Sequence, residues 1–547
     1  MSRITRAIIV TVFVLLSGLI FLFGVRGLPG NPDIQTLLQA HQWVKDGPLE
    51  LSPERGRYAL LYSIVEDKSL HFSVPVAILA TPDLGMNEAG QYVSLFAPGV
   101  SFLAIPGYLL GKMLGASQVG AYLVISFFAI LNMLLIRSMA LRLGARYFPA
   151  LLAALTFGFA TPAFAYGVNL YQHHISVFVM LLALYLLIRF QGAWVFASVW
   201  LLCSLSVVID NPNLFLMLPI GLYAVTKLGK DWYGEVARIG ATWKEMIRSF
   251  RYGITFLALF IPLGFFFWYN QAAYGHPLQL PGTLRGVDEI GLDGKPVTEN
   301  TYEKQVLTEE QKRSQREGSS KEKTAVGFFE TRNLYEGFRV HFLSPDRGIL
   351  SFAPVVLLGM VGLGLLYRRR TSMATLMIGV IGMNVLTYSM WGDPQGGWAF
   401  GSRYLIPSYA LLSLGIAFPF SEWKWKKFFL VLFIPLFIYS AWVNSLGAVT
   451  SSANPPKVEV LSLEKQTGHE QKYTFLRNWE FLHQKYEKVG SKSFLYQAGL
   501  KHHLSALEYQ SLVFGLVLFT ATLLGLGFFL EGRVQKKAER KTQNSST

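Results

Sequence analysis

Cysteine and charged residues are both scarce in this chain of 547 residues. There is one cysteine, Cys203, and only 15% of the residues are charged. A single cysteine excludes an intramolecular disulfide and any metal cluster that needs several thiolates. With 52% hydrophobic and 14% aromatic residues as well, so little charge leaves no room for a large soluble domain. The composition indicates a membrane protein.

Long apolar runs are what the sequence has instead. Twelve of them are long enough to cross about 30 Å of hydrocarbon as helices, so we predict an all-α polytopic membrane protein with about twelve transmembrane helices. The first run is predicted to be an uncleaved span, because no small-residue cleavage site follows it. The runs span residues 7–25, 118–136, 148–166, 174–190, 193–209, 211–227, 251–270, 348–367, 372–390, 403–420, 427–447 and 511–530.

Basic residues sort to one side of these twelve runs. That side has 23 basic and 6 acidic residues, a net charge of +17, whereas the other side has 26 basic and 28 acidic residues, a net charge of −2. Cytoplasmic loops carry the Lys and Arg excess, so both termini are predicted to be cytoplasmic. The pI of 9.6 then reports orientation, and nucleic acid is not expected as a partner.

One apolar segment, residues 97–114, does not fit as a thirteenth span, because it would place Arg137, Arg142 and Arg146 on the outer side. Its two prolines, Pro98 and Pro106, weaken a full crossing. We predict a helix that lies in the outer interface or dips in and returns.

The outer side is predicted to hold three long segments. Residues 26–117 and 271–347 belong to a transmembrane module at 1–447, and residues 448–510 form a small extracytoplasmic segment with clustered aromatic residues. Residues 511–547 then supply the last transmembrane helix and a basic cytoplasmic tail.

Two of these segments have distinctive local patterns. Residues 283–330 are charged and poor in large apolar residues, which is typical of a mobile loop. A disordered insertion is favoured there over a lid. In the first segment, Ile34, Leu37, Leu38 and Val44 have helical spacing, which predicts an interfacial helix that begins next to Asp33.

Asp33 is the first candidate for chemistry. A carboxylate held between a span and an interfacial helix is suited to accept a proton from an acceptor hydroxyl. The alternative is that Asp33 caps the helix that begins at Ile34, and one residue can serve both roles.

Two arginines at the outer boundary are candidates for phosphate binding. Arg403 follows a glycine-rich stretch and begins the tenth span, at the depth where a lipid phosphate lies, and a guanidinium binds phosphate with two hydrogen bonds. Its alternatives are pairing with Asp393 or reaching to lipid headgroups. Arg347, before the eighth span, is the second such cation, unless it forms a local pair with Asp346.

Other polar residues gather at the outer turns. His173 and His174 are suited to contact phosphate when charged or a metal when neutral, but adjacent histidines point apart on a helix, so no joint metal site is predicted. An interfacial polar turn is the alternative. Asp83 and Tyr92 lie ahead of residues 97–114, where a solvated turn explains them equally well, and Asp210 is attributed to a turn.

The order of these parts resembles the GT-C superfamily of membrane glycosyltransferases that use polyprenyl-phosphate sugars, especially the bacterial protein-mannosyltransferase-like and aminoarabinose-transferase-like group. The likeness covers the first four predicted spans and spans eight to ten. It is carried by Asp33, by RYALLYSIVEDKSLHFS at Arg57 to Ser73, by Tyr92 to Gly99 leading to Ala104-Ile105-Pro106, by LSPDRGILSFAP at Leu343 to Pro354, and by GGWAFGSRYLIP at Gly396 to Pro407.

The resemblance implies a GT-C-like fold and transfer of a sugar from a polyprenyl-phosphate donor to a lipid, glycan or protein acceptor. Asp33 corresponds to the general base and Arg403 to the cation on the lipid phosphate, assisted by Arg347 or by His173 and His174. The reaction is a single displacement with inversion, on the extracytoplasmic face of a bacterial inner or plasma membrane.

The chain departs from the pattern in two places. Phe96 stands where related chains often have a lysine. The first outer loop also lacks the paired acids of the metal-dependent oligosaccharyltransferases, so no cofactor is expected to be required, and a role for a divalent metal stays open.

A membrane transporter or lipid flippase is the main alternative function. It predicts ionisable residues near the middle of the bilayer, of which the predicted spans contain few, and no inverted repeat is visible in the sequence. An assembly partner that uses residues 448–510 for protein contacts is a third class.

Overall fold

The computed structural model describes residues 2–544 except 42–48, 240–249, 292, 298–328, 422–425, 458, 461–463, 466–467, 469, 471 and 484–489. The fold is almost entirely helical.

The first half of the chain forms α1 (Arg3–Gly24), α2 (Ile34–His41), α3 (Ser52–Tyr62), a π-helical turn (Ser63–Asp67), α4 (Val74–Ala80), β1 (Leu84–Met86), β2 (Tyr92–Ser94), α5 (Gly99–Met113), α6 (Ser117–Arg142), α7 (Tyr147–Phe159), α8 (Ala163–Tyr166), α9 (His173–Arg189), α10 (Ala193–Ile209), α11 (Asn213–Ile239), η2 (Thr255–Leu259) and α13 (Phe260–Tyr274).

The second half forms η3 (Pro281–Thr283), β3 (Arg285–Val287), η5 (Thr331–Asn333), α15 (Leu334–Leu343), α16 (Ile349–Phe352), η6 (Pro354–Leu357), α17 (Leu358–Arg369), α18 (Thr371–Ser389), η7 (Arg403–Leu405), α19 (Ile406–Ser421), α20 (Lys426–Val449), α22 (Leu476–Leu482), α23 (Phe494–Ala498), η9 (Leu500–His502) and α24 (Ala506–Asn544).

Membrane-spanning helices dominate the molecule. Among the described residues, seven helices are long and apolar enough to cross a bilayer, and three shorter apolar helices, α7, α9 and α10, accompany them. The chain is therefore an all-α polytopic membrane protein, as predicted. Each of the twelve predicted spans overlaps a helix, and the number of crossings stays a prediction. The seven helices are Arg3–Gly24, Ser117–Arg142, Phe250–Tyr274, Thr371–Ser389, Arg403–Ser421, Lys427–Val449 and Ala506–Arg533.

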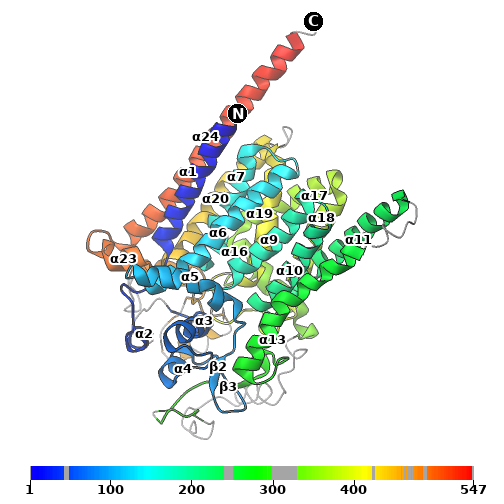
Figure 1. Cartoon of the computed structure of the whole chain (residues 1–547). Coiled ribbons are helices and arrows are strands. Elements are labelled where there is room, and N and C mark those ends of the chain that lie inside the picture. The colour runs from blue at the N-terminus through cyan, green and yellow to red at the C-terminus, as the bar shows by residue number, and fades with distance from the viewer. Residues whose placement is uncertain are drawn as a thin grey trace.

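The two ends of the helical bundle differ (Figure 1). The N- and C-terminal helices α1 and α24 lie side by side, and both termini are at one end, which we call the terminal face. Helices α2, α3 and α4 with the strands lie at the opposite end, the loop face. Two termini at one end require an even number of crossings.

Helix α5 lies across the loop-face end of the bundle (Figure 1), and its position in the membrane interface stays a prediction. It packs tightly on α6 because both helices have glycine at the crossing. A Cβ atom at Gly120 would lie only 2.2 Å from the carbonyl oxygen of Gly107. This contact fixes the first outer segment to the bundle.

The first outer segment has an apolar core of its own, which includes Tyr58, Leu61, Leu79 and Val93. It contains a three-stranded antiparallel sheet in the order β2-β1-β3, in which Leu84 of β1 pairs with Ser94 of β2 and with Val287 of β3. The sequence does not predict this sheet. It takes in the first residues of the predicted 283–330 insertion, whereas residues 298–328 lie outside the described residues.

Candidate active site

Two arginines from distant parts of the chain meet at the loop face. Arg57 of α3 and Arg403 at the start of η7 both lie beside the ring of Tyr171, at 6.0 and 5.7 Å from guanidinium carbon to ring centroid. Arg57 is buried and Arg403 is partly exposed. We call the group of Arg57, Arg403, Tyr171, His173 and Asp210 the arginine cluster.

Both guanidiniums have N–H groups without a hydrogen-bond acceptor among the described residues. Arg57 donates through Nη1 to the carbonyl oxygen of Pro53 at 2.9 Å, and Arg403 through Nη2 to that of Gly396 at 2.7 Å. The Nε atom of each is buried and has no hydrogen-bond partner. Burial lowers the pKa of Arg57 to about 10, so it still carries its charge at neutral pH.

Unpaired polar atoms surround these guanidiniums. The hydroxyl of Tyr171 and Nε2 of His173 are buried without a hydrogen-bond partner, and the two rings stack at 5.7 Å. Buried polar groups are nearly always satisfied in a folded protein. These unsatisfied groups, beside two guanidiniums that have no ion pair in the described part of the chain, mark the candidate site.

The arginine cluster has one carboxylate, Asp210, at the end of α10. Gln172 donates a hydrogen bond to it at 3.1 Å. Burial raises the pKa of Asp210, against the opposing effects of Arg57, this hydrogen bond and Arg403. No ion pair joins Asp210 to either arginine among the described residues. Two cations with at most one anion leave a net positive charge, which favours an anionic ligand.

A second buried group of charges lies beside the cluster, and its charges form ion pairs with one another. Glu50 accepts ion pairs from Arg26 and Lys492, each at 2.6 Å, and a hydrogen bond from the backbone N–H of Ser452 at 2.7 Å. We call Arg26, Glu50 and Lys492 the ion triad. Burial alone would raise the pKa of Glu50, but Lys492 and Arg26 lower it well below its usual range. The triad joins the residues just after α1 and just before α3 to the 448–510 segment.

Glu54, in the first turn of α3 and four residues after Glu50, is completely buried. Burial raises its pKa to about 7, against the attraction of Arg26, and the charge of Glu50 adds to the rise. One carboxylate oxygen accepts the backbone N–H of Glu50 at 3.1 Å, and the other has no hydrogen-bond partner.

Asp33 lies outside the arginine cluster. It is exposed, and its carboxylate accepts the backbone N–H of Thr36 at 2.8 Å. The hydrogen bond from Thr36 lowers the pKa of Asp33. The capping role is therefore confirmed, whereas the role as general base stays a prediction.

Arg347 is completely buried, and backbone carbonyls occupy its donors. It donates to the carbonyl oxygens of Gln395, Gly397 and Asn454 at 2.8–3.0 Å, and to that of Asp346 at 2.8 Å. These bonds hold the glycine-rich loop that leads to Arg403. In this structure Arg347 therefore positions the loop, and its direct contact with substrate stays a prediction.

The two histidines diverge, as expected for neighbours on a helix. His173 belongs to the arginine cluster, whereas Nε2 of His174 lies 2.7 Å from the carbonyl oxygen of Ala163, deep between helices. Asp83 accepts a hydrogen bond from Ser52, and Tyr92 donates to Gly294 at 2.8 Å, so both belong to the folded first outer segment. Within the described ranges no group of three His, Cys, Asp or Glu side chains is arranged to hold a metal ion.

Sequence reasoning missed Arg57 and Asp210 as site residues. Arg57 lies in a helix that the sequence does not distinguish from its surroundings, and Asp210 precedes Asn211 and Pro212, a combination typical of turns. An arginine next to the run YALLYSIV is a signal, because a charge beside a buried apolar run is seldom accidental.

Together the fold and the site define a polytopic helical membrane protein with a largely buried cationic site at the loop face. No family model and no curated protein matches the chain. Two solved structures of ArnT from Cupriavidus metallidurans are similar to it. The apo structure has a TM-score of 0.41 and 14% identity, over 96% of this chain and 78% of that one.

The second structure, of ArnT bound to undecaprenyl phosphate, has a TM-score of 0.41 and 12% identity, over 95% of this chain and 77% of that one. ArnT is a GT-C glycosyltransferase, an aminoarabinose transferase, from the group that the sequence resembles.

Proposed function

We propose that the protein transfers a sugar from a polyprenyl-phosphate donor to an acceptor at the loop face. The observation that carries this proposal is the pair of guanidiniums, Arg57 and Arg403, which both lie beside the ring of Tyr171 and have N–H donors without a partner among the described residues. Guanidiniums bind phosphate oxygens with paired, charge-assisted hydrogen bonds. Their position at the boundary of the spans is where the phosphate of a membrane lipid lies.

The proposed reaction is a single displacement. A bond forms between an acceptor oxygen and the anomeric carbon while the bond from that carbon to the lipid phosphate breaks, which inverts the anomeric configuration. Arg57 and Arg403 offset the negative charge that grows on the departing phosphate. The acceptor is a lipid, a glycan or a protein.

The acceptor proton needs a base. Asp33, the carboxylate that the resemblance assigns, is ionised at neutral pH and accessible from the loop face. The negative charge of Asp210 offsets part of the positive charge of the two arginines. Its proposed role is therefore in binding the polyprenyl-phosphate sugar. No step of this scheme requires a metal ion or other cofactor.

The terminal face is proposed to be cytoplasmic. Basic clusters at the ends of the spans support this orientation through the positive-inside rule. The protein would then be a multi-pass protein of the bacterial inner membrane, with the loop face extracytoplasmic.

Release of polyprenyl phosphate from a polyprenyl-phosphate sugar by the purified protein tests the proposal. Asp33→Asn is the informative variant, because asparagine caps a helix as well as aspartate but accepts no proton. We expect kcat to fall about 10²–10⁴-fold with an unchanged unfolding temperature. Full turnover by Asp33→Asn would exclude this base. A protein that moves the lipid between leaflets without cleaving it would be a flippase instead.

A further inference from the structure

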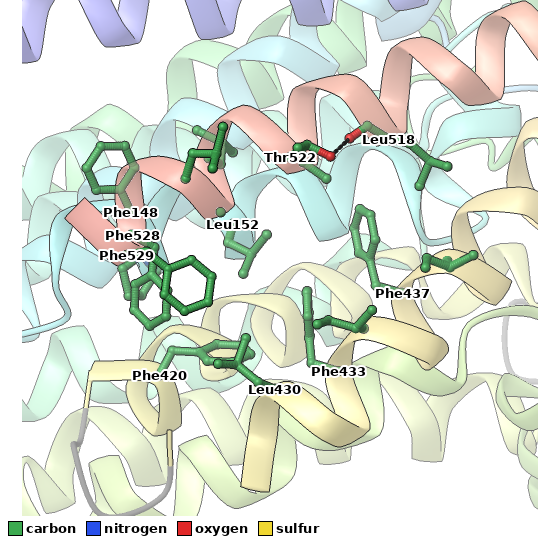
Figure 2. Close-up of a pocket in the computed structure, with 17 residues that line it drawn as sticks. Phe148, Leu152, Phe420, Leu430, Phe433, Phe437, Leu518, Thr522, Phe528 and Phe529 are labelled. Atoms are coloured by element: carbon green, nitrogen blue, oxygen red, sulfur yellow. Dashed lines mark hydrogen bonds between the residues drawn. The ribbon is translucent and has the colours of Figure 1, made fainter. Parts of the chain in front are cut away.

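An apolar groove lies toward the terminal face, far from the arginine cluster. It runs between α20 and α24 with α7 at its base, and Figure 2 shows the rings that line it. Its volume is about 300 Å³. The one polar side chain in the lining, Thr522, donates its hydroxyl to the carbonyl oxygen of Leu518 at 2.8 Å. The aromatic lining consists of Phe148, Phe420, Phe433, Phe437, Phe528 and Phe529.

The groove opens to the side of the bundle that faces hydrocarbon. Ile434 and Phe529 line it and are 51% and 54% exposed, on two helices that are long and apolar enough to span the membrane. With its only hydroxyl already bonded, the groove can bind a hydrocarbon chain but no polar molecule.

Close packing of α24 on α7 borders the groove. This helix rests directly on α7, where a Cβ atom at Gly527 would lie 2.0 Å from Cε1 of Phe148. The same contact that fixes α24 leaves the space beside it open.

Three guanidiniums gather at the end of the groove. Arg146 lies 5.9 Å from the ring of Phe528, and Arg137 and Arg6 lie 4.9 and 5.7 Å from the ring of Tyr147, the residue before Phe148. The Nε atoms of Arg137 and Arg146 are buried without a hydrogen-bond partner. One carboxylate, Glu531, faces Arg146 at 3.6 Å, so the group has a net positive charge.

We propose that this place binds an anionic phospholipid of the bilayer. The headgroup phosphate lies on Arg146, Arg137 and Arg6, and one acyl chain fills the groove between α20 and α24. Basic pockets between transmembrane helices bind anionic headgroups in this way. The bound lipid completes the packing of α24 and does not depend on the proposed transferase activity.

Glycines of α24 provide the test of the acyl-chain part. A Cβ atom at Gly525, which lines the groove, or at Gly515, which does not, would meet no atom within 4 Å. Gly525→Phe therefore adds a large side chain to the lining of the groove without a clash at its Cβ atom, and Gly515→Phe is the matched control on the same helix. The full-length protein in detergent is titrated with phosphatidylglycerol or phosphatidylcholine, and binding is read by native mass spectrometry.

We expect phosphatidylglycerol to bind more tightly than phosphatidylcholine, and Gly525→Phe, but not Gly515→Phe, to abolish that binding. Arg137→Gln should weaken phosphatidylglycerol about fivefold, with exposed Arg142 on the same helix as the control position. Equal binding of the two lipids, or unchanged binding by Gly525→Phe, would overturn the proposal. So would a change of oligomeric state in Gly525→Phe, because a second copy of the chain would then be the occupant.

Discussion

The ion triad and the arginine cluster are neighbours at the loop face, and both are largely buried. They differ in whether their charges form ion pairs. In the triad, the carboxylate of Glu50 lies within 2.6 Å of both Arg26 and Lys492. In the cluster, Arg57 and Arg403 have no ion pair among the described residues.

The difference separates a structural role from a functional one. A buried charge is costly unless it is paired, so the triad has the arrangement expected of a group that holds segments together. Unpaired cations are retained where a ligand supplies the missing anion. If this distinction is right, substitutions in the triad reduce stability, and substitutions in the cluster reduce activity.

The largest expected effect on stability belongs to the triad. Glu50→Gln leaves Arg26 and Lys492 buried without their anion, so we expect the free energy of unfolding to fall by about 3–5 kcal/mol, measured by denaturation in detergent. Glu66→Gln is the control, because the Glu66–Lys112 pair at 2.7 Å is partly exposed and such pairs contribute about 0–1 kcal/mol. Similar losses in the two variants would contradict the structural role of the triad.

Substitutions in the arginine cluster should reduce turnover more than stability. Arg403→Ala or Arg57→Ala removes a donor to the departing phosphate, so we expect kcat to fall about 10²–10³-fold, measured as release of polyprenyl phosphate. The loss of unfolding free energy should be smaller than for Glu50→Gln, since no ion pair between described residues is broken; for Arg57→Ala it comes from lost packing against the ring of Phe96 at 4.7 Å. Arg403→Lys, which keeps the charge but not the planar fork, should restore part of the activity. A loss of stability without loss of turnover would make the cluster structural.

Glu54 interacts electrostatically with both groups. Its titration makes the stability of this region depend on pH. Its pKa is raised to about 7, chiefly by burial, so the folded state binds the proton more tightly than the unfolded state does. The stability that this proton contributes is complete below the ordinary pKa of the carboxyl and is lost as pH rises through about 7. Glu54→Gln keeps an acceptor oxygen and removes the titration.

We therefore expect the parent protein to lose about 1–3 kcal/mol of unfolding free energy between about pH 5 and pH 8, and Glu54→Gln to lose less. Unfolding temperatures of the parent protein and of Glu54→Gln across a pH series measure this difference. Parallel curves for the two proteins would show that another group dominates the pH dependence.

Much of the fold could be predicted because it follows from local patterns. Apolar runs predicted the membrane-spanning helices. Prolines and the charge pattern predicted that the helix now seen as α5 is separate from these spans. Arg403 was predicted as a site residue because it stands where a glycine-rich loop meets an apolar run. Arg57 and Asp210 were not, because their role depends on approaching Arg403 across long sequence separations. Strands of three residues, such as β3, have too few alternating positions to give a pattern.

The smallest expected effect on stability concerns Asp33, whose charge is exposed, unlike those of the triad and the cluster. Its structural contribution is one capping hydrogen bond to Thr36, so Asp33→Ala should lower the unfolding free energy by about 0.5–2 kcal/mol, whereas Asp33→Asn should leave it unchanged. If Asp33 is also the base, both variants lose turnover to the same extent although only one loses stability. Turnover that follows stability instead would show that Asp33 acts only through α2.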